Sequence, residues 1–193
     1  MNIANRISTI CFSISILGCC FSSLFAQSIN FSHLTVEDGL SNNIVNSVIQ
    51  DQSGFLWFAT EDGLNRYDGY EFKIFRHNPL DSNSLSDNSI WALTEDKNGN
   101  IWIGTKAGVL NKYDPVYEKF THWKIESEFT EENSVKSIFE DSKGNIWIGS
   151  YKEGLYKLNL STNKLNHWIR DKNNPQSLSH NYILSILEDI SEK

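Results

Sequence analysis

The chain has 193 residues, of which 39% are hydrophobic and 12% aromatic, and it carries a formal net charge of −7 at pH 7. This apolar and aromatic content is sufficient for a packed core and excludes a disordered chain. The acidic balance excludes the basic surface that nucleic-acid binding or a polybasic membrane patch requires, so no nucleic-acid partner is expected.

Residues 1–26 have the order of regions that is typical of a secretory signal peptide. Arg6 supplies positive charge, an apolar and Ser-rich stretch without charged residues follows, and Ala26 offers a small residue at the cleavage position. We therefore predict cleavage after Ala26 and a periplasmic mature chain. An uncleaved membrane anchor and lipid attachment at Cys19 are the alternatives.

The three cysteines of the chain, Cys11, Cys19 and Cys20, all lie within this amino-terminal segment. The rest of the sequence has none. A disulfide framework and a cysteine-based zinc site are therefore excluded from the mature region.

From residue 27 onward the chain repeats itself with a period of 45 residues. A period of this length is typical of the blades of a β-propeller, in which each blade is one supersecondary unit that packs on the next. The residues that recur most clearly are a tryptophan and a turn aspartate, namely Trp57, Trp102 and Trp147, and Asp51, Asp96 and Asp141.

Each copy contains the signals of four short strands. The first strand ends in Asp-x-x-Gly, in which the Asp caps backbone N–H groups of the turn and the Gly tolerates positive φ. The second strand is rich in β-branched and aromatic residues, and no stretch between strands has room for a crossover helix. The expected first strands are 44–50, 89–95, 134–140 and 182–188, the second 55–60, 100–105 and 145–150, and the fourth 71–77, 117–123 and 164–169.

A short segment before the first copy resembles a fourth strand without its own blade. Phe31-x-His33 matches a pattern found in the later fourth strands, so we expect residues 29–36 to form a strand that closes a ring with the last blade. The matching patterns are Phe75-x-His77, Phe120-x-His122 and Leu165-x-His167.

These patterns predict an all-β fold, a β-propeller fragment of about three four-stranded antiparallel blades plus an amino-terminal closing strand and the start of a fourth blade. The propeller region is 27–193. Its expected repeats are about 37–83, 84–133, 134–180 and a partial copy at 181–193.

The recurrence of the Trp and Asp residues favours structural roles, because a residue present in every blade serves every blade. We expect Trp57, Trp102 and Trp147 to pack between blades with the indole N–H on a backbone acceptor, rather than to act as sugar platforms. We expect the aspartates to cap turns rather than to serve acid–base catalysis or calcium binding.

The sequence predicts neither a metal site nor a cofactor site. The histidines of the fourth strands lie on the outer strands of different blades, whereas the ligands of one ion must converge to about 2 Å. No catalytic motif is present, so no catalytic residue is assigned. The histidines are His33, His77, His122 and His167.

Asparagines that precede the first strands are the candidate ligand contacts. In a propeller the first strand lines the central channel, and the linker that feeds it lies on the usual ligand face. We single out Asn88 and Asn133 for hydrogen bonds to a ligand, with capping of the linker turn as the alternative. The segment 124–132 departs from the repeat and is acidic, which indicates either a functional loop or a solvated one. The full asparagine set is Asn43, Asn88, Asn133 and Asn181.

Two stretches, Asp96-Lys-Asn-Gly-Asn-Ile-Trp-Ile-Gly-Thr105 and Asp141-Ser-Lys-Gly-Asn-Ile-Trp-Ile-Gly-Ser150, resemble the two-component regulator propeller repeat. The motifs Leu40-Ser-Asn-Asn43, Leu85-Ser-Asp-Asn88 and Leu178-Ser-His-Asn181 resemble it as well. The stretch from Phe31 to Asn43 is similar to the amino-terminal opening of the sensor region of hybrid two-component histidine kinases.

The resemblance implies an extracytoplasmic ligand-sensing propeller, a truncated part of such a kinase that responds to oligosaccharides. Its partners would be an oligosaccharide and the remainder of the kinase, with membrane contact only through a downstream span that this sequence lacks. The chain itself would not be an enzyme, since it has no kinase motif. The alternatives are a propeller lyase or hydrolase, because antibiotic-inactivating lyases have similar repeats, and a protein-interaction propeller.

Overall fold

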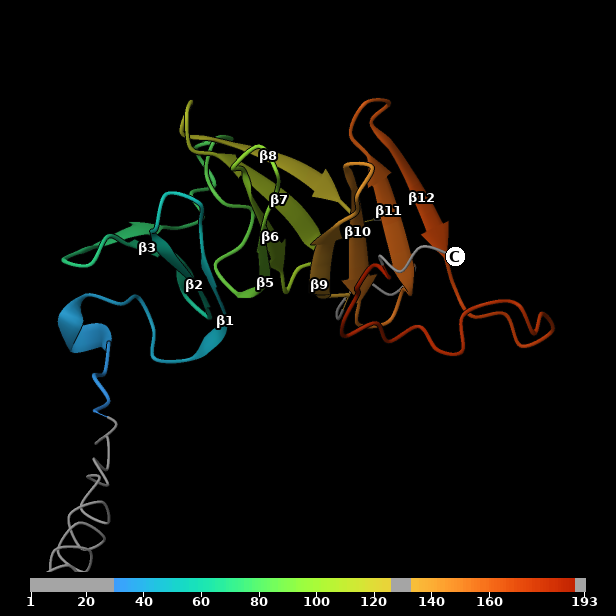
Figure 1. Cartoon of the computed structure of the whole chain (residues 1–193), viewed down its shortest axis with the longest axis horizontal. Coiled ribbons are helices and arrows are strands. Elements are labelled where there is room, and N and C mark those ends of the chain that lie inside the picture. The colour runs from blue at the N-terminus through green and yellow to red at the C-terminus, as the bar shows by residue number, and fades with distance from the viewer. Residues whose placement is uncertain (1–29, 126–132, 190–193) are drawn as a thin grey trace, which may run out of the picture. The chain divides into compact units, whose positions relative to one another are not determined.

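The computed structural model describes residues 30–125 and 133–189 (Figure 1). The chain divides into two compact units, Met1–His33 and Leu34–Lys193, and every described strand lies in the second unit. The only helix among the described residues is a 3₁₀ turn, η1 (Val36–Asp38). No helix in the described ranges is long and apolar enough to cross a membrane. The predicted cleavage site after Ala26 lies outside the described residues.

Twelve strands in the described part of the chain form three four-stranded antiparallel sheets, each a meander of consecutive strands (Figure 1). This confirms the predicted all-β fold built from four-stranded blades. Blade 1 contains β1 (Val45–Gln50), β2 (Leu56–Thr60), β3 (Gly63–Tyr67) and β4 (Phe72–Phe75). Blade 2 contains β5 (Ile90–Glu95), β6 (Ile101–Thr105), β7 (Val109–Asp114) and β8 (Lys119–Lys124). Blade 3 contains β9 (Val135–Glu140), β10 (Asn145–Ser150), β11 (Leu155–Asn159) and β12 (Lys164–Trp168).

The fourth strands align differently from the sequence-based expectation. Because the β3–β4 hairpin is shorter than the hairpins of the later blades, the motif Phe75-x-His77 does not superpose on the two later motifs. His77 lies beyond the end of β4, whereas His122 and His167 lie within β8 and β12. The residues at the same position of the three fourth strands, each opposite a leucine of the third strand, are Phe75, Trp123 and Trp168.

Neither of the two partial elements forms a strand. Residues 30–35 carry no strand, and the 3₁₀ turn that follows is capped by Thr35 and ended by Gly39 at φ 104°. Residues 182–188 have no strand pairing, although the Ile183 N–H donates to the Ser150 carbonyl at 3.0 Å. A strand requires a neighbouring strand that is hydrogen-bonded along its length. Neither segment has such a neighbour among the described residues.

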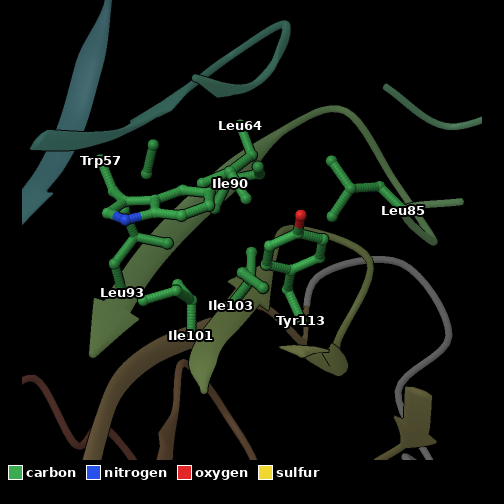
Figure 2. Packing of buried hydrophobic residues seen from close by; sticks show 9 residues of the cluster. Trp57, Leu64, Leu85, Ile90, Leu93, Ile101, Ile103 and Tyr113 are labelled. Carbon is green, nitrogen blue, oxygen red and sulfur yellow. The ribbon is translucent and has the colours of Figure 1, made fainter. Parts of the chain in front are cut away.

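The core lies between blades. Trp57 of blade 1, 1% exposed, packs against aliphatic and aromatic side chains of blade 2 (Figure 2). Trp102 of blade 2, 0% exposed, packs in the same way against blade 3. Each buried aliphatic side chain contributes about 1.5–3 kcal/mol, so these contacts hold neighbouring blades together. Trp147 of blade 3 has no described blade beyond it and is half-buried.

A glutamate at the end of the first strand adds a polar link between blades. Glu140, at the end of β9, accepts a 2.8 Å hydrogen bond from the backbone N–H of Lys97 in the turn of the preceding blade. Glu95 and Glu188 make the equivalent bonds to the N–H groups of Gln52 and Ser142. With β1 next to β5 and β5 next to β9, the first strands of all three blades lie side by side.

Candidate functional site

The recurring Asp and Trp residues bond to each other within each blade. In blade 2 the Asp96 Oδ1 accepts the backbone N–H groups of Asn98 and Asn100, which caps the turn, and Oδ2 accepts the Trp102 indole N–H at 2.8 Å. The prediction that the indole N–H bonds to a backbone acceptor is therefore wrong. The Asp carboxylate is buried beside the indole and is the stronger acceptor. The same bond is 2.7 Å in the Asp51–Trp57 pair and 2.9 Å in the Asp141–Trp147 pair.

The Asp141 carboxylate is strongly held in its ionised form. Burial alone would raise its pKa, but hydrogen bonds from the Asn145 backbone, the Trp147 indole, the Asn145 side chain and the Lys143 backbone outweigh this and lower the pKa to about 2. The carboxylate is therefore fully engaged in hydrogen bonds that hold the turn and the second strand. The structure therefore places it in the turn and leaves it no lone pair suited to catalysis.

The linker asparagines differ among themselves. Asn88 accepts the His77 backbone N–H at 2.7 Å through Oδ1 and the Gly63 N–H at 2.7 Å through its own carbonyl, so it caps the linker. Its Nδ2 makes no hydrogen bond to a described residue. Asn133 is 7% exposed, and its side chain interacts with the Tyr156 hydroxyl.

Three histidines bond to backbone carbonyls, and His77 and His122 do so at adjacent residues. His77 Nδ1 lies 2.6 Å from the Leu85 carbonyl oxygen, and His122 Nε2 lies 2.9 Å from that of Ser84. His167 Nε2 bonds to the Glu153 carbonyl, and its ring stacks on Tyr156. Among the described residues no group of three His, Cys, Asp or Glu side chains could hold a metal ion.

The second residue of each first strand is at the same place in every blade and is chemically different in each. These residues are Asn46, Trp91 and Lys136, at 45-residue spacing on β1, β5 and β9. Together with Ser137 and Leu184 they line one groove of about 260 Å³ along the first strands. The repeat is thus broken at the surface that faces the axis of a propeller.

A second row of unlike residues follows the second strands. Glu61, Lys106 and Tyr151 are again 45 residues apart, and the backbone N–H of each bonds to the residues just before a first strand. Glu61 accepts the Ser89 hydroxyl at 2.7 Å and the Asn46 amide at 3.1 Å. These two hydrogen bonds hold the pKa of Glu61 below its ordinary value, and the nearby lysines lower it further.

Lys136 and Trp91 are in direct contact. The Lys136 ammonium lies 3.0 Å from the centroid of the Trp91 ring and 5.4 Å from that of Tyr151, which gives a cation–π interaction. Burial lowers the pKa of Lys136, and Lys106 lowers it further while Glu61 opposes the shift. The Trp91 indole N–H is buried and has no acceptor among residues 30–125 and 133–189.

From the sequence, the groove residues and their neighbour Glu61 were missed, because only positions at which the same residue type repeats were considered. The signal that could have found them is the opposite one, a fixed position at which the residue type changes in every copy. Glu61, Trp91 and Lys136 meet that criterion.

Comparison with known proteins identifies the repeats. A family model described as two component regulator propeller matches residues 39–62, 84–107 and 131–152. Histidine kinase P4 of Formosa agariphila is 47% identical over 75 residues, which are 38% of this chain and 6% of that protein.

Two solved structures place the fold among propellers. The extracellular domain of a putative hybrid two-component system of B. thetaiotaomicron has a TM-score of 0.72 and 30% identity, over 85% of this chain and 22% of that one. Virginiamycin B lyase of Staphylococcus aureus has a TM-score of 0.54 and 15% identity, over 75% of this chain and 46% of that one. The second likeness shows the fold alone. The chain thus spans less than a quarter of the solved sensor domain and a small part of the curated kinase.

Proposed function

Since this chain carries two-component regulator propeller repeats, we propose that it is part of an extracytoplasmic ligand-sensing propeller of a hybrid two-component sensor kinase and that the ligand is an oligosaccharide. The similarity to a histidine kinase and to the extracellular domain of a hybrid two-component system supports the sensor assignment. The remainder of the kinase would then be the partner that carries the signal across the membrane.

The break in the repeat along the groove is the observation that carries the ligand-binding part of the proposal. A propeller needs the same packing residues in every blade, and the Asp–Trp pairs supply them. Asn46, Trp91 and Lys136 do not repeat, although Asn46 donates to the Ile90 carbonyl of blade 2 and Lys136 lies over Trp91, and all three line the groove. An aromatic ring among a few polar groups is the usual composition of a site for a small polar ligand.

Binding suits these side chains better than catalysis does. Both oxygens of Glu61 are occupied by Asn46 and Ser89, and its pKa is lowered, which keeps the carboxylate ionised. A general acid needs the opposite, a carboxyl group whose pKa is raised toward the working pH. We therefore propose that this chain binds its ligand without transforming it. The likeness to a lyase, at 15% identity, supports no assignment of that activity.

Asn88 and Asn133 stay in the proposal as ligand contacts. The Nδ2 of Asn88 makes no hydrogen bond to a described residue and could donate to a sugar hydroxyl while Oδ1 keeps the linker capped. Asn133 lies just before β9, and its amide, beside the Tyr156 hydroxyl, is the second proposed contact for a ligand near the linker.

The proposed location is the periplasm, with cleavage after Ala26. Amino-terminal sequencing of the mature protein should begin at Gln27. A mature protein that starts at Met1, or one that carries lipid on Cys19, would contradict this part of the proposal.

The sensor assignment is tested most simply by the coding sequence beyond Lys193. A sensor predicts further propeller blades, a membrane-spanning segment and histidine-kinase motifs downstream. A stop codon directly after one completed ring would instead favour an enzyme or a protein-interaction module.

A further inference from the structure

We propose that the groove binds its oligosaccharide through an anionic substituent, a carboxylate or a sulfate ester, which lies between Lys106 and Lys136 beside the Trp91 ring. This inference rests on the ligand-sensing function proposed above and names the chemical class of its ligand. Three features of the groove carry it: the lysines, the acidic groups around them, and the indole N–H.

Neither lysine forms an ion pair with a described carboxylate, although Glu61 attracts both ammonium groups from a distance. The two ion pairs within the described ranges join Lys73 to Glu118 and Arg76 to Asp62. Lys136 is half-buried, and its ammonium rests on the Trp91 ring rather than on a carboxylate. A partly desolvated cation without an anion is held at a free-energy cost, which an incoming anion would offset.

Among the described residues, the acidic side chains Glu61 and Asp87 near the lysines are already occupied by hydrogen bonds. Glu61 accepts hydrogen bonds from Asn46 and Ser89. Asp87 accepts the backbone N–H groups of Ser89 and Ala107, at 3.3 and 3.1 Å. These neutral donors fix both carboxylates, so neither is released to pair with a lysine. Glu61 still attracts the two ammonium groups, so two positive charges and one negative charge interact beside the groove-lining Lys136.

Trp91 adds an unsatisfied donor to this positive site. Its Nε1–H is buried and has no acceptor among the described residues, and a buried donor without a partner costs about 1–3 kcal/mol. An anionic oxygen is the strongest acceptor that a ligand can offer to such a donor. A sugar that bears a carboxylate or a sulfate would satisfy the indole and the ammonium together, whereas a neutral sugar would leave the ammonium unpaired.

The test measures binding to the full 193-residue chain by isothermal titration calorimetry with two matched pairs of probes. One pair is trigalacturonate and its methyl ester, and the other is 3′-sulfolactose and lactose. Within each pair only the anionic group differs. We expect the anionic member of at least one pair to bind about tenfold more tightly, which is the effect of one charge-assisted hydrogen bond, and the pair that shows it identifies the group.

Variants locate the effect. Lys136→Gln and Lys106→Gln should each remove most of the preference for the anionic probe. Lys164→Gln, at the exposed start of β12, should leave that preference unchanged. Melting curves of all three variants show whether each protein is folded, and the Lys106 variant keeps the test valid if Lys136→Gln does not fold.

Three results would overturn the inference. These are equal affinity for the neutral and anionic members, an anionic preference that survives both lysine substitutions, and no binding of any probe. A poly-glutamate peptide that binds as tightly as the anionic sugars would also overturn it, since it would indicate a protein partner. None of these results decides the sensor assignment, which depends on the kinase motifs encoded downstream.

Discussion

The indole Nε1 of Trp147 donates a 2.9 Å hydrogen bond to Oδ2 of Asp141, the residue six positions earlier that begins the turn before its strand. The same bond recurs in the other two blades. In blades 1 and 2 it joins the turn at the end of the first strand to the aromatic side chain that packs on the next blade. Loss of this hydrogen bond is therefore expected to destabilise both the turn and the packing between blades.

Replacement of this carboxylate should be costly. In Asp141→Ala the backbone N–H groups of Lys143 and Asn145, the Asn145 amide and the Trp147 indole lose a buried acceptor. We expect the free energy of unfolding to fall by about 3 kcal/mol, measured by denaturant titration.

The matched control is Asp68→Ala. Asp68 also caps a turn, through the N–H groups of Tyr70 and Glu71, but it is exposed. Water can replace an exposed acceptor, so the loss should be much smaller than in Asp141→Ala. Equal losses in the two variants would contradict the proposed role of burial.

The depressed pKa of Asp141 predicts a loss of stability in acid. Its folded-state pKa is about 2, below the ordinary value of 3.8, so the stabilisation is fully present above about pH 4. It is lost as the pH falls from about 4 through 2, and it amounts to about 2 kcal/mol. Unfolding measured between pH 5 and pH 2 should show a weaker pH dependence in Asp141→Ala than in the unmodified chain. An unchanged dependence would contradict the assignment.

Two substitutions of Asn88 distinguish a capping role from a ligand-binding role. Asn88→Ala removes the acceptor for the His77 N–H and should lower stability by about 1 kcal/mol, whereas Asn88→Asp retains that acceptor and should melt near the unmodified chain. If Nδ2 contacts the ligand, both variants should bind the oligosaccharide more weakly. An Asn88→Asp variant with unchanged binding to a neutral sugar would show that Asn88 is a cap only.

Asn133 should behave differently, because its buried side chain contacts the Tyr156 hydroxyl and caps no linker N–H among the described residues. Asn133→Ala is expected to lower the melting temperature less than Asn88→Ala does and to weaken ligand binding. A loss of stability equal to that of Asn88→Ala would instead indicate a structural role.

The fold was predictable from the sequence because propeller packing repeats. The Asp turn and the Trp of each second strand recur at 45 residues, and the strands lie within a few residues of their predicted positions. The register of β4 was not predictable from the Phe-x-His pattern. Hairpin length, rather than that pattern, determines which residue lies opposite Leu64, and the short first hairpin places Phe75 there.

The candidate site was only partly predictable. The linker asparagines were found because they recur, and Asn88 proved to cap the linker through Oδ1. Trp91, Lys136 and Glu61 were missed because each occurs once at its position. Their significance depends on which strands lie side by side, and local sequence patterns do not contain that information.

The central claim is that a ligand binds along the first strands, beside Trp91. Two-dimensional ¹H–¹⁵N NMR of the chain resolves the indole N–H signals of its six tryptophans. Addition of the oligosaccharide should shift the Trp91 indole signal, whose N–H has no acceptor in the described part of the chain, and leave those of Trp57 and Trp102, which are bonded to aspartates, in place. An unmoved Trp91 signal at saturating ligand would contradict the account.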